Sequence, residues 1–210
     1  MNASQQGIML GFTQESFPES GHICLIYEND EQRRKIVAQY LAAGVRQGEL
    51  VRYFTDETTP ETIRSWLLDM GVELPEVEEK GSFMIAQAEN AYCPSGRFEP
   101  QAMIDGCVHR YDLAKQAGYH GVRSTGEMTW VLKGLPGSDR VLEYEALLNT
   151  VSSTFPHSGM CQYDARVFDG ATLFKVIQIH PYMIAQGQVV RNPYYLPPQE
   201  FLAELTSKQS

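Results

Sequence analysis

The chain has 210 residues, of which 43% are hydrophobic and 20% charged, so its size and composition fit one sizeable soluble domain. Its 26 acidic residues outnumber its 17 basic residues, which gives a formal net charge of −9. Because nucleic-acid binders need a basic face to displace counterions from phosphate, this balance argues against direct binding to DNA or RNA.

The sequence also lacks the patterns of export and of membrane insertion. The N-terminus has no signal-peptide pattern, and no window approaches the 18 apolar residues of a membrane span. The cysteines show no C-x-x-C spacing, so neither a zinc motif nor a redox motif is indicated. We therefore expect a reduced, cytoplasmic protein that does not contact a membrane. The four cysteines are Cys24, Cys93, Cys107 and Cys161.

The first half of the chain alternates predicted strands with predicted helices. Residues 1–20 are polar and without periodicity, which predicts a flexible lead-in. Asp30 is the expected N-cap of the first helix, which Gly48 closes. Strands are predicted at residues 22–27, 49–55 and 82–86, and helices begin after residue 30, near Pro60 and at Pro100.

The second half continues this alternation around a central stretch, residues 119–130 (YHGVRSTGEMTW). Val122 is its only aliphatic residue, so its strand character rests partly on its flanks. A helix is predicted around residues 141–151, a strand at 159–164, a helix ending at His180-Pro181 and a hairpin over 182–191. The predicted fold is α/β, with three layers: a mostly parallel sheet flanked by helices, and an antiparallel hairpin at one edge.

Candidate ligand-binding residues follow the strands. Ligands of open α/β sheets lie outside the carboxyl ends of the strands, which selects Arg123, Glu127 and Trp130 in the central stretch. The same argument adds Tyr163 and Asp164, and Asp164 could meet Arg123 across neighbouring strands. Alternatively, Arg123 and Glu127 form a structural ion pair and Trp130 packs in the core.

Aromatic residues in the loop of residues 87–99 extend this candidate site. Tyr92 and Phe98 could form the wall of a small-molecule pocket, or pack beneath the loop as a satellite cluster. The loop is longer than a median connection, which favours a lid. We predict no metal or cofactor, because the histidines are scattered without ligand spacing, and no catalytic signature is present. The histidines are His22, His109, His120, His157 and His180.

Several short motifs together resemble a known family. They are residues 22–28 (HICLIYE), the Gly48-Glu49 step into a strand ending at 55–57 (TDE), 92–98, 126–130 (GEMTW), 142–145 (LEYE), 161–164 (CQYD), 180–181 (HP) and 192–195 (NPYY). In order and spacing they resemble a MEDS domain, the sensory domain named for methanogens, methylotrophs and the DcmR regulator. The resemblance covers about residues 20–198. It places the sensory domain at 21–198, between the lead-in of 1–20 and a C-terminal tail of 199–210.

The resemblance implies a sensor of small molecules, often hydrocarbon derivatives, with a layout similar to RecA/KaiC-like ATPases. Such an ATPase has G-x-x-x-x-G-K-[ST] after its first strand, whereas this chain has ENDEQR at residues 28–33. Without the glycines and the Lys-Ser/Thr pair it lacks a phosphate cradle, so we do not expect P-loop ATP hydrolysis.

The predicted function is therefore a non-catalytic sensory domain that binds a small molecule and signals to a partner regulator. The chain departs from the DcmR pattern because nothing before residue 20 resembles a helix-turn-helix, so either the output passes through a separate protein or the chain is an excised domain. A ligand-free interaction module and an enzyme with an unrecognised site remain alternatives. The sequence leaves homo-oligomerisation and the ligand open.

Overall fold

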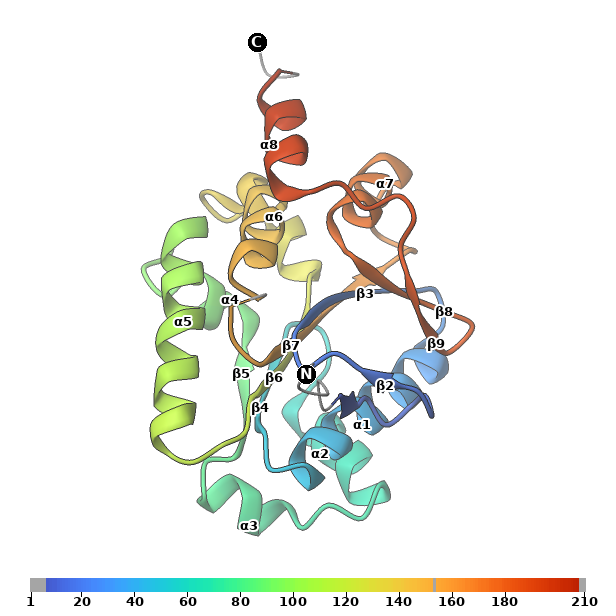
Figure 1. Ribbon diagram of the computed structural model, residues 1–210, viewed down its shortest axis with the longest axis vertical. Coiled ribbons are helices and arrows are strands. Elements are labelled where there is room, and N and C mark those ends of the chain that lie inside the picture. The colour runs from blue at the N-terminus through green and yellow to red at the C-terminus, as the bar shows by residue number, and fades with distance from the viewer. Residues whose placement is uncertain (1–6, 153, 208–210) are drawn as a thin grey trace, which may run out of the picture.

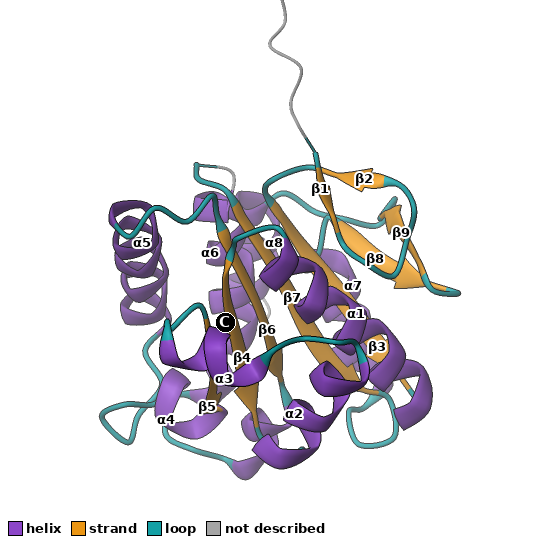
Figure 2. Ribbon diagram, turned by 90° about the horizontal axis from the view of Figure 1, so that it is seen from below, coloured by secondary structure: helices purple, strands orange, loops and turns teal. Residues whose placement is uncertain are grey.

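A computed structural model describes residues 7–152 and 154–207, which form a seven-stranded sheet between two layers of helices (Figures 1 and 2). The strand order is β5-β4-β6-β7-β3-β8-β9, and only the β8–β9 pairing is antiparallel. The predicted fold class and hairpin are thus confirmed. The strands are β3 (Gly21–Tyr27), β4 (Leu50–Thr55), β5 (Phe83–Gln87), β6 (Val122–Glu127), β7 (His157–Asp164), β8 (Tyr182–Ala185) and β9 (Gln188–Arg191).

The helices cover both faces of this sheet because side chains along each strand alternate between two cores. Ile23 and Leu25 of β3 pack with α1 and α2, whereas Cys24 packs in a second core with α5, α6 and α7. The helices are α1 (Asp30–Arg46), α2 (Pro60–Asp69), α3 (Leu74–Glu79), α4 (Ala88–Tyr92), α5 (Pro100–Gln116), α6 (Val141–Ser152), α7 (Gly170–Ile179) and α8 (Pro198–Ser207), with 3₁₀ helices η1 (Thr129–Lys133) and η2 (Ser138–Arg140).

The helix starts follow local capping rules, with one correction. The N-cap of α1 is Asn29 rather than Asp30, and its side chain accepts from the backbone N–H groups of Glu31 and Gln32. The cap is shifted by one residue, and Asp30 instead becomes an acidic residue in the first turn, where the helix dipole favours it. Pro60 and Pro100 each lie in the first turn of their helix, as predicted.

The two ends of the described chain are more structured than the sequence suggests. Residues 7–20 of the lead-in carry the antiparallel strands β1 (Ile8–Met9) and β2 (Ser16–Phe17), and Leu10 is completely buried. This part of the lead-in is packed rather than loose. In the segment set apart as the tail, α8 packs on α6 through buried Phe201. Among the described helices, none has the length and apolar character that crossing a membrane requires.

Candidate functional site

A cleft of about 670 Å³ opens where β3, β4, β6 and β7 end, at the carboxyl edge of the sheet. Its apolar lining comes from Tyr27 at the end of β3, Trp66 of α2, Leu132 of η1 and Val167 after β7. Threonine residues line it from the β4–α2 connection, from α2 and from η1. These are Thr58, Thr59, Thr62 and Thr129.

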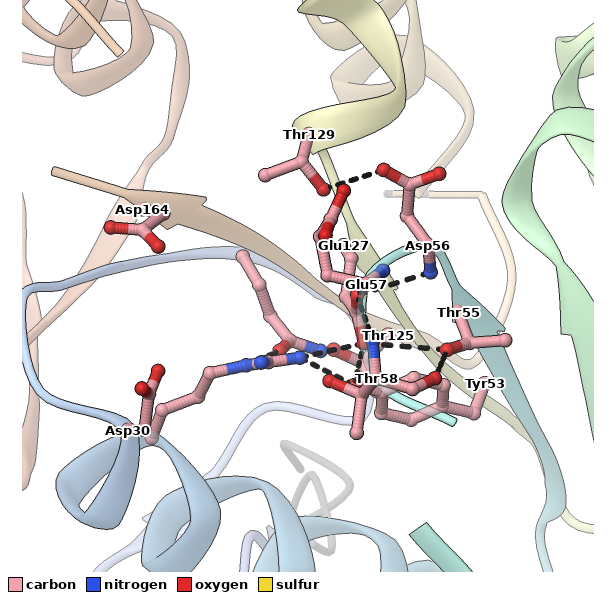
Figure 3. A network of polar contacts seen from close by, with 12 residues as sticks. Asp30, Tyr53, Thr55, Asp56, Glu57, Thr58, Thr125, Glu127, Thr129 and Asp164 are labelled. Carbon is pink, nitrogen blue, oxygen red and sulfur yellow. Dashed lines mark hydrogen bonds and ion pairs between the residues drawn. The ribbon is translucent and has the colours of Figure 1, made fainter. Parts of the chain in front are cut away.

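Glu127, the last residue of β6, lies at the base of this region and is 1% exposed (Figure 3). Its Oε2 accepts hydrogen bonds from the backbone N–H groups of Asp56, Glu57 and Thr58 at 3.0, 2.6 and 3.1 Å. Its Oε1 accepts from the Tyr53 hydroxyl at 2.7 Å. The connection from β4 to α2 is therefore wrapped around one carboxylate, which fixes the wall of the cleft.

Arg33 of α1 compensates the charge of this carboxylate. Its Nη2 lies 2.7 Å from Glu127 Oε1, and its Nε donates to Gln162 Oε1 at 2.8 Å. The guanidinium also lies over the rings of Tyr27 and Trp66, at 5.0 and 5.8 Å. Burial alone would raise the pKa of Glu127, but Arg33 and the hydrogen bonds outweigh burial and lower it. Glu127 is thus an ionised, fully bonded group.

The rim of the cleft carries two further cations, and each is paired. Arg166 lies 2.8 Å from Asp30 and 2.6 Å from Asp164, and its hydrogen bonds lower the pKa of both carboxyl groups. Lys133 pairs with Asp56. Because the cations lining the cleft already have carboxylate partners, they offer no uncompensated positive charge to a polyphosphate.

The connection between β3 and α1 is also unsuited to phosphate. Only Glu28 and Asn29 separate the strand from the helix, and the Asn29 side chain occupies two of the first N–H groups of α1 at 2.9 and 3.0 Å. A phosphate cradle needs free N–H groups in this position.

Arg123 lies away from the cleft, against the prediction. It is the second residue of β6, which continues through Ser124, Thr125 and Gly126 to Glu127, so it is not near the carboxyl end. Its Nε lies 2.5 Å from Glu49 Oε2, and it donates to the Tyr40 and Met9 carbonyls. It therefore pairs with neither Glu127 nor Asp164, and both of those expectations are wrong.

The predicted aromatic residues pack in the core on the face of the sheet that α5, α6 and α7 cover, rather than at its carboxyl edge. Trp130 stacks on Tyr92 at 4.9 Å and contacts Phe98 at 5.0 Å, and none of the three is more than 4% exposed. Tyr163 is 1% exposed and donates to Glu145. The core-packing interpretation thus describes their placement. The loop of residues 87–99 is anchored by α4 and by the Phe98 N–H on the Pro136 carbonyl, so it does not form a free lid.

Of the predicted site residues, the structure brings Glu127 and Asp164 to the cleft region. The sequence analysis missed Tyr27, Arg33, Trp66, Leu132 and Lys133 as parts of it. The sequence contains one indication of Arg33: it is a cation three residues after Asp30, in a helix start that otherwise carries acidic residues. The position of Trp66 depends on how α2 packs, which no local pattern reveals.

Comparison with known protein families matches residues 21–181 to the family described as "MEDS: MEthanogen/methylotroph, DcmR Sensory domain". Among curated proteins, the chain is 26% identical over 162 residues to the transcriptional repressor DcmR of Methylorubrum extorquens. The match covers 76% of this chain and 57% of the repressor, so the chain spans little more than half the length of that relative.

Similar solved structures share the fold at low sequence identity. A KaiC-like protein of Pyrococcus horikoshii has a TM-score of 0.58 and 15% identity, covering 85% of this chain and 79% of that one. An uncharacterised protein of the same organism, in complex with an unknown peptide, has a TM-score of 0.59 and 14% identity, and the match covers 81% of each chain. The flagellar accessory protein FlaH of Methanocaldococcus jannaschii has a TM-score of 0.54 and 8% identity, and the match covers 81% of this chain and 75% of that one. These likenesses establish a RecA/KaiC-like fold and carry no ligand with them.

Proposed function

Because the chain belongs to the MEDS sensory-domain family, we propose that it binds a small molecule in the cleft and passes the occupied state to a partner regulator. The observation that carries this proposal is the cleft itself, in which four apolar residues and four threonines lie beside the ion pair of Arg33 with the buried Glu127. Arg33, Lys133 and Arg166 of the cleft each have a carboxylate partner, so none of the three is free to bind an anion, which favours an uncharged ligand with one or two hydrogen-bonding groups. Threonine hydroxyls supply those bonds.

A ligand can signal only through unequal affinity for two conformations. The β4–α2 connection supports such a response because Thr58 both lines the cleft and bonds to Glu127 through its N–H. A ligand that contacts Thr58 therefore acts on the same loop that the carboxylate holds. We propose that a shift of this loop and of the start of α2 is what the partner detects.

The proposal is tested by thermal-shift screening of small uncharged compounds against the purified protein. A ligand at 100 times its Kd adds about 2.7 kcal/mol to the free energy of unfolding. For any hit, Leu132→Glu places a charge in the cleft and is expected to weaken binding at least tenfold, about 1.4 kcal/mol.

Leu113→Glu is the matched control, because Leu113 of α5 is 50% exposed, Leu132 is 52% exposed, and Leu113 does not line the cleft. It should leave affinity unchanged. Hits that respond equally to the two substitutions, or an uncharged library that produces no hit, would count against a ligand in this cleft and in favour of an interaction module.

We further propose that the domain is non-catalytic and does not bind ATP. Titration with ATP and magnesium is expected to give no saturable response in calorimetry, because the β3–α1 connection is too short for a cradle and Asn29 occupies its N–H groups. Saturable binding at micromolar ATP that Asn29→Gly strengthens would show that this site still accepts phosphate.

A further inference from the structure

Four side chains that can ligate a metal converge in the core between the sheet and the helices α6 and α7. They come from four elements: His22 from β3, Glu145 from α6, Cys161 from β7 and His180 from the end of α7. One ligand atom of each lies within 4.8 Å of all the others, and none of the residues is more than 6% exposed. The sequence analysis did not predict this set because its members are far apart in the chain.

Of the six separations between these atoms, three have the spacing of a tetrahedral shell, a fourth is shorter, and the other two are within 4.8 Å. Metal–ligand bonds of 2.0–2.3 Å at tetrahedral angles place ligand atoms roughly 3.3–3.7 Å apart. From Glu145 Oε2, the distances are 3.0 Å to His22 Nε2, 3.4 Å to Cys161 Sγ and 3.7 Å to His180 Nε2. His22 Nε2 lies 3.3 Å from Cys161 Sγ.

Hydrogen bonds outside the cluster direct the Nε2 atom of both imidazoles toward it. His180 Nδ1 lies 2.7 Å from the Val176 carbonyl, which can only accept, so Nδ1 carries the proton and Nε2 presents its lone pair. Asn149 Nδ2 donates to two carbonyls, which turns its Oδ1 toward His22 Nδ1 at 3.1 Å. His22 Nδ1 is therefore the donor to Asn149, and Nε2 faces the cluster, 3.0 Å from Glu145 Oε2.

The carboxylate is oriented in the same way, because the Tyr163 hydroxyl donates to Glu145 Oε1 at 2.5 Å and leaves Oε2 facing the cluster. Partners of this kind behind each ligand are typical of metal sites.

One group of the cluster is left without a partner. Glu145 Oε2 can pair with His22 Nε2 at 3.0 Å and accept from the Cys161 thiol at 3.4 Å, but neither contact satisfies His180 Nε2. His180 Nε2 has no hydrogen-bond partner among the described residues, although it is completely buried. A divalent cation would satisfy all four groups at once, and a thiolate with a carboxylate would neutralise its charge.

We propose that His22, Glu145, Cys161 and His180 bind one Zn²⁺ ion in a closed, four-ligand structural site that ties β3 and β7 to α6 and α7. Nitrogen, sulfur and oxygen ligands in a tetrahedral arrangement suit Zn²⁺, and four protein ligands leave no open position for catalysis. A second cleft, of about 380 Å³, is lined by His22, Asn149 and Pro181 and gives the ion a route from solvent.

The test is metal analysis of the purified full chain by mass spectrometry, followed by replacement with Co²⁺. We expect about one zinc per chain, and in the cobalt form a thiolate-to-cobalt charge-transfer band with tetrahedral ligand-field bands that saturate at one equivalent. Protein that is isolated without a transition metal, and that takes up cobalt without the charge-transfer band, would overturn the proposal.

Variants assign the ligands. Cys161→Ser is expected to abolish the charge-transfer band, whereas Cys24→Ser, which changes the buried cysteine opposite it on β3, should retain the band. If Cys161→Ser does not fold, Asn149→Leu keeps all four ligands and should weaken metal affinity 10- to 100-fold through His22. Unchanged zinc affinity in Asn149→Leu, or a retained band in folded Cys161→Ser, would contradict the assignment.

Discussion

Glu127→Gln is expected to lower the free energy of unfolding by about 3–5 kcal/mol. The carboxylate accepts three backbone N–H groups on one oxygen and faces Arg33 and Tyr53 with the other. An amide must turn its NH₂ group toward one of these donor sets, which leaves buried donors unsatisfied and Arg33 without a counter-charge. Thermal or urea unfolding measures the loss.

Glu57→Gln is the matched control, because it removes the same charge from an exposed side chain in the β4–α2 connection. It should change stability by no more than about 0.5 kcal/mol. A loss below about 1 kcal/mol in Glu127→Gln, similar to that of the control, would show that the carboxylate does not hold the β4–α2 connection.

The pH dependence of stability provides a second test of Glu127. The pKa of Glu127 is lowered from its ordinary value of 4.5, mainly because Arg33 and the hydrogen bonds overcome burial. A lowered folded-state pKa contributes stability that is fully present above 4.5 and is lost as the pH falls through the folded value. The difference between the wild type and Glu127→Gln should therefore be constant at neutral pH and shrink only below pH 4.5.

The sequence predicts the fold well because the fold depends on periodicity and turn chemistry, which are local. Apolar strand patterns such as residues 22–27, and prolines such as Pro60 and Pro100, mark elements that the structure contains. Local patterns fail where burial is created by tertiary packing. Leu10 lies in a short apolar run, residues 8–12 (IMLGF), that shows no helical or strand periodicity, so its burial depends on how the lead-in packs on the core.

The site was harder to predict because a strand position decides which end of the sheet a side chain reaches. With Val122 as the only aliphatic residue, the end of β6 was ambiguous, and Arg123 was assigned to the wrong end. The position of Arg123 depends on its close packing against Gly44 of α1. A Cβ there would lie 2.6 Å from Arg123 Cδ, so this glycine lets the arginine cross α1, but the relation appears only once the helix is packed on the sheet.

Arg123→Met is also expected to lower the free energy of unfolding by about 3–5 kcal/mol. Arg123 is completely buried, and its partner Glu49 is 5% exposed. Burial raises the pKa of Glu49 and Arg123 lowers it, with burial the larger effect, so Glu49 depends on the guanidinium to stay charged. The substitution also removes the guanidinium hydrogen bonds to the Tyr40 and Met9 carbonyls, although Gln47 Nε2 still donates to the Met9 carbonyl at 2.7 Å.

A double-mutant cycle separates the ion pair from these backbone contacts. Glu49→Leu alone should also destabilise, because it leaves the buried guanidinium without its counter-charge. Adding Glu49→Leu to Arg123→Met removes the second buried charge, so the double variant should lose less than the sum of the singles, by about 1–3 kcal/mol. It should not regain wild-type stability, because the hydrogen bonds from Arg123 to the Tyr40 and Met9 carbonyls are still missing. Strict additivity, measured by urea unfolding of all four proteins, would mean that Arg123 acts through its backbone hydrogen bonds and that Glu49 contributes nothing as an ion.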